Sequence, residues 1–133
     1  MAKQTLFAYV QGTDLDGVSD ALAAKFDDLV AARKWIVKDV WVVNQRVDGP
    51  SAGAAAEWDL GLNLTLPTTR GKTASWIDDA VAIATAFGSI HRETGRKFVI
   101  GIHDAKADVA KDLFFVDNDS PDLSALRTAL QGA

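Results

Sequence analysis

The chain has 133 residues, 48% of them hydrophobic and 24% charged, and it contains no cysteine. A length of this order suits one domain, here residues 1–133, and the lack of cysteine excludes disulfide scaffolds, thiolate metal sites and cysteine nucleophiles. Its 14 lysines and arginines are scattered and outnumbered by 18 acidic residues, for a formal net charge of −4. Non-specific nucleic-acid binding depends on clustered positive charge, so nucleic acid is not expected as a partner.

Targeting signals are the next feature to consider. Residues 1–10 carry one lysine and lack the long apolar core of a secretory signal. No apolar run in the sequence approaches the roughly 20 residues of a membrane-spanning helix. We therefore expect a soluble, cytoplasmic protein that has no membrane partner.

The first two elements are a strand and a helix. Residues 3–11 are apolar and aromatic, which favours a strand. Residues 13–16 approximate a capping box, with aspartate in place of the usual glutamate. Apolar side chains then recur at helical spacing and predict an amphipathic helix over residues 15–34. These side chains are Val18, Leu22, Phe26, Leu29 and Val30.

Two strands that form a hairpin are expected next. β-branched and aromatic residues predict a strand over residues 35–47, and a Gly-Pro-Ser turn follows within 48–53. Residues 57–66 alternate between apolar and polar side chains without a break, which is the pattern of a strand with one buried face. We therefore predict that this strand lies centrally in an antiparallel sheet, with Leu62 and Leu64 in the core. Its apolar side is formed by Trp58, Leu60, Leu62, Leu64 and Leu66.

A second amphipathic helix is predicted from a cap at Thr73 or Ser75 to Gly95, a favoured helix stop. Its apolar stripe is formed by Trp76, Ala80, Ile83, Phe87 and Ile90. Residues 98–103 and 113–116 predict two further strands, joined by a polar connection over 104–111.

A short helix that starts at Pro121 ends the chain, with leucines at positions 123, 126 and 130. The predicted order is therefore βαββαββα. Its first six elements are the split βαβ, or ferredoxin-like, arrangement, and a C-terminal strand and helix are added. The fold class we expect is α+β, with a mainly antiparallel sheet and two long helices on one face.

Residues 70–73 read Arg-Gly-Lys-Thr and lie between a predicted strand and a predicted helix. A phosphate-binding loop needs a glycine five positions before Gly71, and Leu66 occupies that place, so we reject a nucleotide triphosphatase. A weaker hypothesis remains, in which Arg70, Lys72 and Thr73 hold an anion at the start of the helix. A solvated basic loop is the more common structure for such a segment.

Metal and acid–base sites have little support in the sequence. The aspartates within 117–122 lack the glycine and the glutamate of a calcium loop. His91 and His103 are the only histidines, and their spacing fits no known metal motif. His103 with Asp104 and Asp59 is the best available acid–base group. We expect no cofactor and no bound metal.

The remaining feature of functional interest is the second face of the predicted sheet. The two long predicted helices can cover only one face, yet the first two strands are apolar on both. Phe7, Tyr9, Trp41 and Val43 are the residues expected on the second face. Large aromatic side chains dominate interface energies, and exposed together they would form an unusually large apolar patch.

Two functions fit this pattern. The first is a small non-enzymatic protein that acts by protein–protein binding or by self-association, for example as a homodimer with Trp41 near its centre, although coverage of this face by the C-terminal helix is also open. The alternative is a small-molecule-binding protein or a cofactor-free enzyme that uses the open face. A flat apolar face would favour the first function. A deep pocket where His103, Asp104 or Asp59 converge would favour the second.

Overall fold

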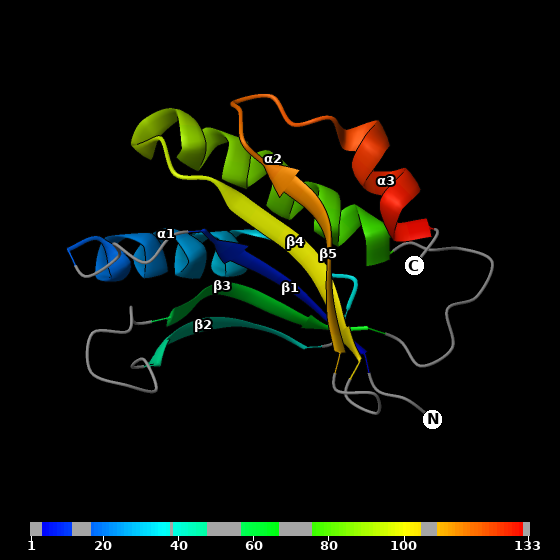
Figure 1. Cartoon of the computed structure of the whole chain (residues 1–133), viewed down its shortest axis with the longest axis horizontal. Helices are drawn as coiled ribbons and strands as arrows, with labels where there is room; N and C mark the ends of the chain where they lie inside the picture. The colour runs from blue at the N-terminus through cyan, green and yellow to red at the C-terminus, as the bar shows by residue number, and fades with distance from the viewer. Residues whose placement is uncertain are drawn as a thin grey trace.

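The computed structural model describes residues 4–11, 17–37, 39–47, 57–66, 76–104 and 109–131. These residues form an α+β structure in which a five-stranded sheet packs against three helices (Figure 1). In chain order the elements are β1 (Gln4–Val10), α1 (Ser19–Ala32), β2 (Val40–Val47), β3 (Glu57–Thr65), α2 (Trp76–Thr94), β4 (Phe98–Asp104), β5 (Val109–Val116) and α3 (Leu123–Gln131).

The strands lie in the order β2-β3-β1-β4-β5, and every neighbouring pair is antiparallel. β3 lies inside the sheet, because Leu62 is opposite Ala8 of β1 on one side and Val42 of β2 on the other. Leu62 and Leu64 are completely buried. The alternating pattern of residues 57–66 therefore predicted both the strand and its central position correctly.

In the described part of the chain, all three helices lie on the same side of this sheet (Figure 1). Leu126 and Leu130 of α3 join the same buried cluster as Val116 of β5, so the terminal helix does not cover the other face. The centre of the core is aromatic. The rings of Phe87 and Phe98 stack at 4.2 Å, and Phe26 of α1 packs on both at 5.6 and 6.4 Å.

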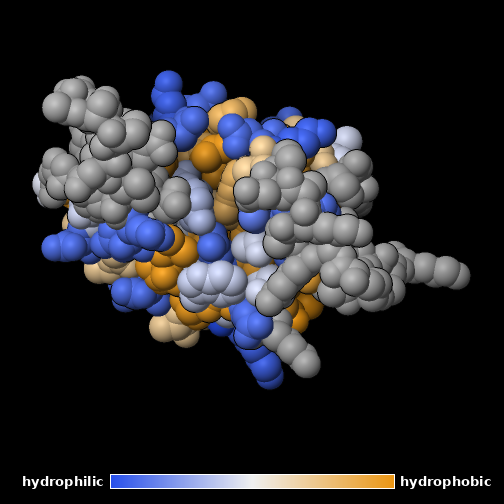
Figure 2. All heavy atoms as spheres, turned by 60° about the horizontal axis from the view of Figure 1, so that its bottom comes forward, coloured by the Kyte–Doolittle hydropathy of each residue, from blue (hydrophilic) through white to orange (hydrophobic). Residues whose placement is uncertain are grey.

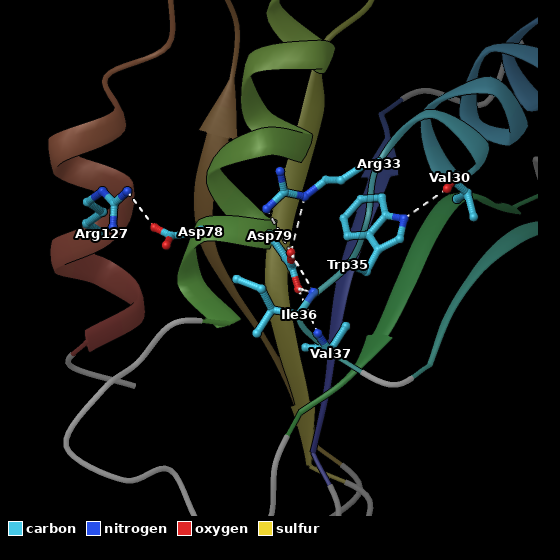
Figure 3. A network of polar contacts seen from close by, with 8 residues as sticks. All are labelled: Val30, Arg33, Trp35, Ile36, Val37, Asp78, Asp79 and Arg127. Carbon is cyan, nitrogen blue, oxygen red and sulfur yellow. Dashed lines mark hydrogen bonds and ion pairs between the residues drawn. The ribbon is translucent and has the colours of Figure 1, made fainter.

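A buried carboxylate, Asp79, joins the start of α2 to the segment that follows α1 (Figure 3). Its side chain is 0% exposed, and it accepts hydrogen bonds from Nε and Nη2 of Arg33 at 3.2 and 2.9 Å. It also accepts the backbone N–H groups of Ile36 and Val37, at 3.0 and 2.9 Å. A buried charge needs such partners, because water no longer solvates it.

This carboxylate explains why the prediction of a strand from residue 35 was wrong. β2 begins only at Val40, and Trp35 folds back so that its Nε1 donates to the carbonyl oxygen of Val30 at 3.0 Å. The backbone donors that a strand would use are taken by Asp79. A side chain 42 residues further along the chain thus overrides the local β-propensity.

The last hairpin also differs from its prediction. β5 begins at Val109, so most of the predicted polar connection over 104–111 is paired strand or lies outside the described residues. The pairing runs from Asp104↔Val109 to Phe98↔Val116, with a bulge near Gly101. Polar residues are tolerated in β5 because it is an edge strand with one side open to solvent.

Candidate ligand site on the open sheet face

The face of the sheet opposite the helices is hollow. A pocket of about 470 Å³ lies on it, which we name the open-face pocket. Its volume falls in the range of about 300–1,000 Å³ that is typical of small-ligand sites. All five strands contribute to its lining, which consists of Thr5, Phe7 and Tyr9 of β1, Trp41 of β2, Asn63 of β3, Val99 and His103 of β4, and Ala110 and Asp112 of β5.

Two aromatic rings from the central strand lie side by side in this pocket. The centroids of Phe7 and Tyr9 are 5.3 Å apart, and their planes are tilted by 50°. Phe7 is only 8% exposed although it lies on the side away from the helices. The Tyr9 hydroxyl donates a hydrogen bond to Oδ1 of Asn63 at 2.7 Å, which fixes the ring against β3.

A glycine on a neighbouring strand makes room for the Phe7 ring. Phe7 is directly opposite Gly101 of β4, and Tyr9 is directly opposite Gly61 of β3. A Cβ on Gly101 would lie 2.4 Å from the Phe7 ring and 2.3 Å from the carbonyl oxygen of Lys111. The absence of a side chain at Gly101 therefore lets the Phe7 ring lie over β4.

The two edges of this face carry exposed aromatic side chains. Trp41 on β2 is 41% exposed, and Phe115 on β5 is 47% exposed. Phe115 is opposite Val99, so both side chains lie on the same face. Val43 on β2 is half-buried and opposite Gly61, next to Trp41 on this face. Figure 2 brings the β2 side of the molecule forward, and hydrophobic side chains gather there between hydrophilic ones.

The bulge in the last hairpin brings an acidic side chain into the pocket. Gly101 is opposite Asp112, whereas the preceding residue, Ile100, is opposite Phe114. Leu113 is the extra residue, and it packs against the core together with Phe114. Because a one-residue insertion shifts the alternation of a strand, Asp112 lies on the open face and Phe114 on the covered one.

Two residues of the predicted acid–base group, His103 and Asp104, extend from opposite faces of β4. His103 lines the open-face pocket. Asp104 follows it in β4, so its side chain extends towards the opposite face. The backbone of Asp59 lies in β3, and its side chain is outside the described residues. The carboxylate that shares the open face with His103 is that of Asp112, one residue past Lys111 on β5.

The remaining candidate residues are not among the described residues that line the open-face pocket. Arg70, Lys72 and Thr73 are outside the described residues. His91 ends α2, where its Nδ1 lies 2.8 Å from Oδ1 of Asp119. Within the described ranges, no three histidine or carboxylate side chains come together as metal ligands would. Over the same ranges, none of the helices has the length and apolar content required to cross a bilayer.

Sequence reasoning missed Asn63 and Asp112. Asn63 was visible as a polar member of the alternating strand, but its contact with Tyr9 depends on the register between β1 and β3. The position of Asp112 on the open face could not be predicted, because no local sequence pattern indicates a β-bulge. No protein-family model, curated protein or solved structure matches this chain.

Proposed function

We propose that this protein binds a small organic ligand in the open-face pocket. The observation that carries the proposal is the hollow of about 470 Å³ lined from all five strands on the face away from the helices. Small-molecule sites are concave and largely apolar, with a few polar groups that fix the ligand's orientation. Here Phe7, Tyr9 and Trp41 supply apolar surface, and Asn63 and Asp112 supply polar groups.

Binding is proposed in preference to catalysis. The acid–base group that the sequence suggested was His103 with Asp104 and Asp59, and the first two extend from opposite faces of β4. The rings of Phe7 and Tyr9, in contrast, pack against each other, and the hydrogen bond to Asn63 holds Tyr9 in place. A surface that is fixed before the ligand arrives loses less conformational entropy on binding.

We also infer that the fold is ferredoxin-like with one added hairpin strand and helix. The order β2-β3-β1-β4 has the first and third strands in the middle, and β5 extends the edge beside β4. The order supports an open sheet face as the binding surface. It does not by itself indicate a ligand, because one fold serves many functions.

The indole N–H group of Trp41 provides a direct test. A ¹⁵N-labelled sample is titrated with small aromatic alcohols, amines and carboxylates, and the indole resonances are assigned with Trp41→Phe and Trp35→Phe variants. We expect the Trp41 signal to shift with at least one probe. Trp35 is the internal control, because its Nε1 is bonded to Val30 on the helix side. A Trp41 signal that no probe moves, or a shift at Trp35 alone, would contradict the proposal.

A second function, protein association through the same face, has one specific observation in its favour. The large hydrophobic side chains that are most exposed in the described part of the chain are Ile36, Trp41 and Phe115. Trp41 and Phe115 lie on the open face, at its two opposite edges. Exposed aromatic residues around a hollow are a common feature of surfaces that bind another protein or a second copy.

A further inference from the structure

The charge of the open-face pocket restricts the ligands that it could take. With histidine counted as neutral, Asp112 is the only charged side chain among the described residues that line it, and none of these is lysine or arginine. The net charge of the whole chain is also negative, at −4. An anionic ligand would therefore meet a carboxylate and no compensating cation among the described lining residues.

The aromatic lining of the pocket also favours a cation over an anion. The faces of aromatic rings carry partial negative charge and attract cations, most strongly at tryptophan. The rings of Phe7, Tyr9 and Trp41 all line the pocket. The Tyr9 hydroxyl donates its proton to Asn63, so it does not offer a hydrogen-bond donor to a ligand.

The positions of Phe7 and Asp112 determine the distance that a ligand in contact with both must span. Phe7 is opposite Gly101, and Gly101 is opposite Asp112, so the three lie in one row across β1, β4 and β5. Because Gly101 has no side chain, the Phe7 ring itself lies over Gly101 and so reaches towards the strand that carries Asp112. Two strand spacings separate the backbones of Phe7 and Asp112, or about 10 Å.

Building on the function proposed above, we propose that the ligand is an organic cation. Its flat or apolar body lies over Phe7 and Tyr9, and its ammonium group extends past the edge of the Phe7 ring to the carboxylate of Asp112. A body of one ring with an amine two or three bonds away spans this row. The ammonium group, which only donates hydrogen bonds, then meets the acceptor oxygens of Asp112.

Three probes with the same phenyl-alkyl body test this inference: 2-phenylethylamine as the cation, 2-phenylethanol as the neutral form and 3-phenylpropanoate as the anion. Affinities are measured by NMR titration at low ionic strength and neutral pH. An exposed ion pair with a cation–π contact adds up to about 1 kcal/mol, so we expect the amine to bind about five-fold tighter than the alcohol. The carboxylate should bind most weakly.

The variant Asp112→Asn should reduce the advantage of the amine to the part that the cation–π contact supplies, and it should leave the affinity of the alcohol unchanged. Asp78→Asn is the matched control, because it removes the same charge from an exposed site on α2, where Asp78 pairs with Arg127. It should leave all three affinities as they are.

The other outcomes distinguish failure of the inferred ligand charge from failure of the proposed function. Three probes with equal affinity, or an anion that binds tightest, would overturn the inference of a cationic ligand and leave the pocket as a ligand site. A variant Asp112→Asn that weakens the alcohol as much as the amine would show that Asp112 shapes the pocket and does not select charge, which also overturns it. If none of the probes shifts Trp41, the proposed function itself fails.

Discussion

Two adjacent aspartates at the start of α2 have opposite surroundings. Asp79 is completely buried and holds Arg33 and two backbone N–H groups. Asp78 is exposed and pairs with Arg127 of α3 at 2.8 Å (Figure 3). The same residue type therefore has a structural role at one position and a minor one at the next.

We expect Asp79→Ala to lower the free energy of unfolding by about 3 kcal/mol or more, because it leaves buried donors without an acceptor. Asp78→Ala should cost less than about 1 kcal/mol, as exposed ion pairs do. Urea denaturation of the two variants measures both values. Equal losses would contradict the role assigned to Asp79.

At the scale of elements, Gly101 links β4 to the pocket. A Cβ at this position would meet the Phe7 ring and the carbonyl oxygen of Lys111, while a Cβ at Gly17 would meet no atom within 4 Å. We expect Gly101→Ala to destabilise the protein by about 1–3 kcal/mol, the usual cost of overpacking, and to displace the Phe7 ring. Gly17→Ala is the control and should leave the ring resonances of Phe7 unchanged. If the ring resonances of Phe7 do not shift in Gly101→Ala, the role assigned to Gly101 in positioning the Phe7 ring is refuted.

The helices α1 and α2 are joined by an exposed ion pair. Nζ of Lys25 lies 2.6 Å from Oε2 of Glu93, and the hydrogen bond and charge of Lys25 lower the pKa of Glu93 below its usual value of 4.5. A carboxylate with a lowered pKa in the folded state adds stability above its unfolded pKa, and this stability is lost as the pH falls through the folded value.

We therefore expect Glu93→Gln to lower the melting temperature slightly at neutral pH, with a difference that shrinks as the pH falls below 4.5 and closes below the lowered pKa of Glu93. Added salt should reduce the same difference, because the pair is exposed. Melting curves at several pH values measure it. A difference that stays constant down to strongly acidic pH would mean that the ion pair does not contribute.

At the scale of the whole molecule, much of the architecture could be read from the sequence. The alternation around Leu62 predicted a central strand, and the spacing of Phe26 and Phe87 predicted helices that pack on the sheet. Strand parity also predicted that Phe7, Tyr9 and Trp41 share a face, because that inference needs only the period of a strand.

The rest could not be read because it depends on contacts between distant parts of the chain. The contact of Asp79 with Val37 joins residues 42 positions apart, and the bond of Tyr9 to Asn63 joins residues 54 apart. The position of Asp112 depends on a bulge, which changes the register without a local signal. The position of the Phe7 ring in the pocket depends on the pairing of Phe7 with Gly101. Only the register between β1 and β4 defines this pairing.

The oligomeric state distinguishes the two functions proposed for the open face. If the exposed rings of Trp41 and Phe115 hold two copies together, sedimentation of the intact protein should give a dimer, and Trp41→Ala should shift it to monomer. If the face holds a small ligand without self-association, both proteins should sediment as monomers at high micromolar concentration. A dimer that survives in both Trp41→Ala and Phe115→Ser would mean that association uses another surface.

The central claim is that the face away from the helices holds the ligand, and intermolecular nuclear Overhauser effects with bound 2-phenylethylamine test it most directly. We predict contacts from the probe's ring protons to the rings of Phe7, Tyr9 and Trp41. A second, smaller hollow of about 280 Å³ lies on the helix side, between Leu22 of α1 and Thr94 at the end of α2. Contacts to Leu22 and Thr94, with none to the three aromatic rings, would contradict the claim.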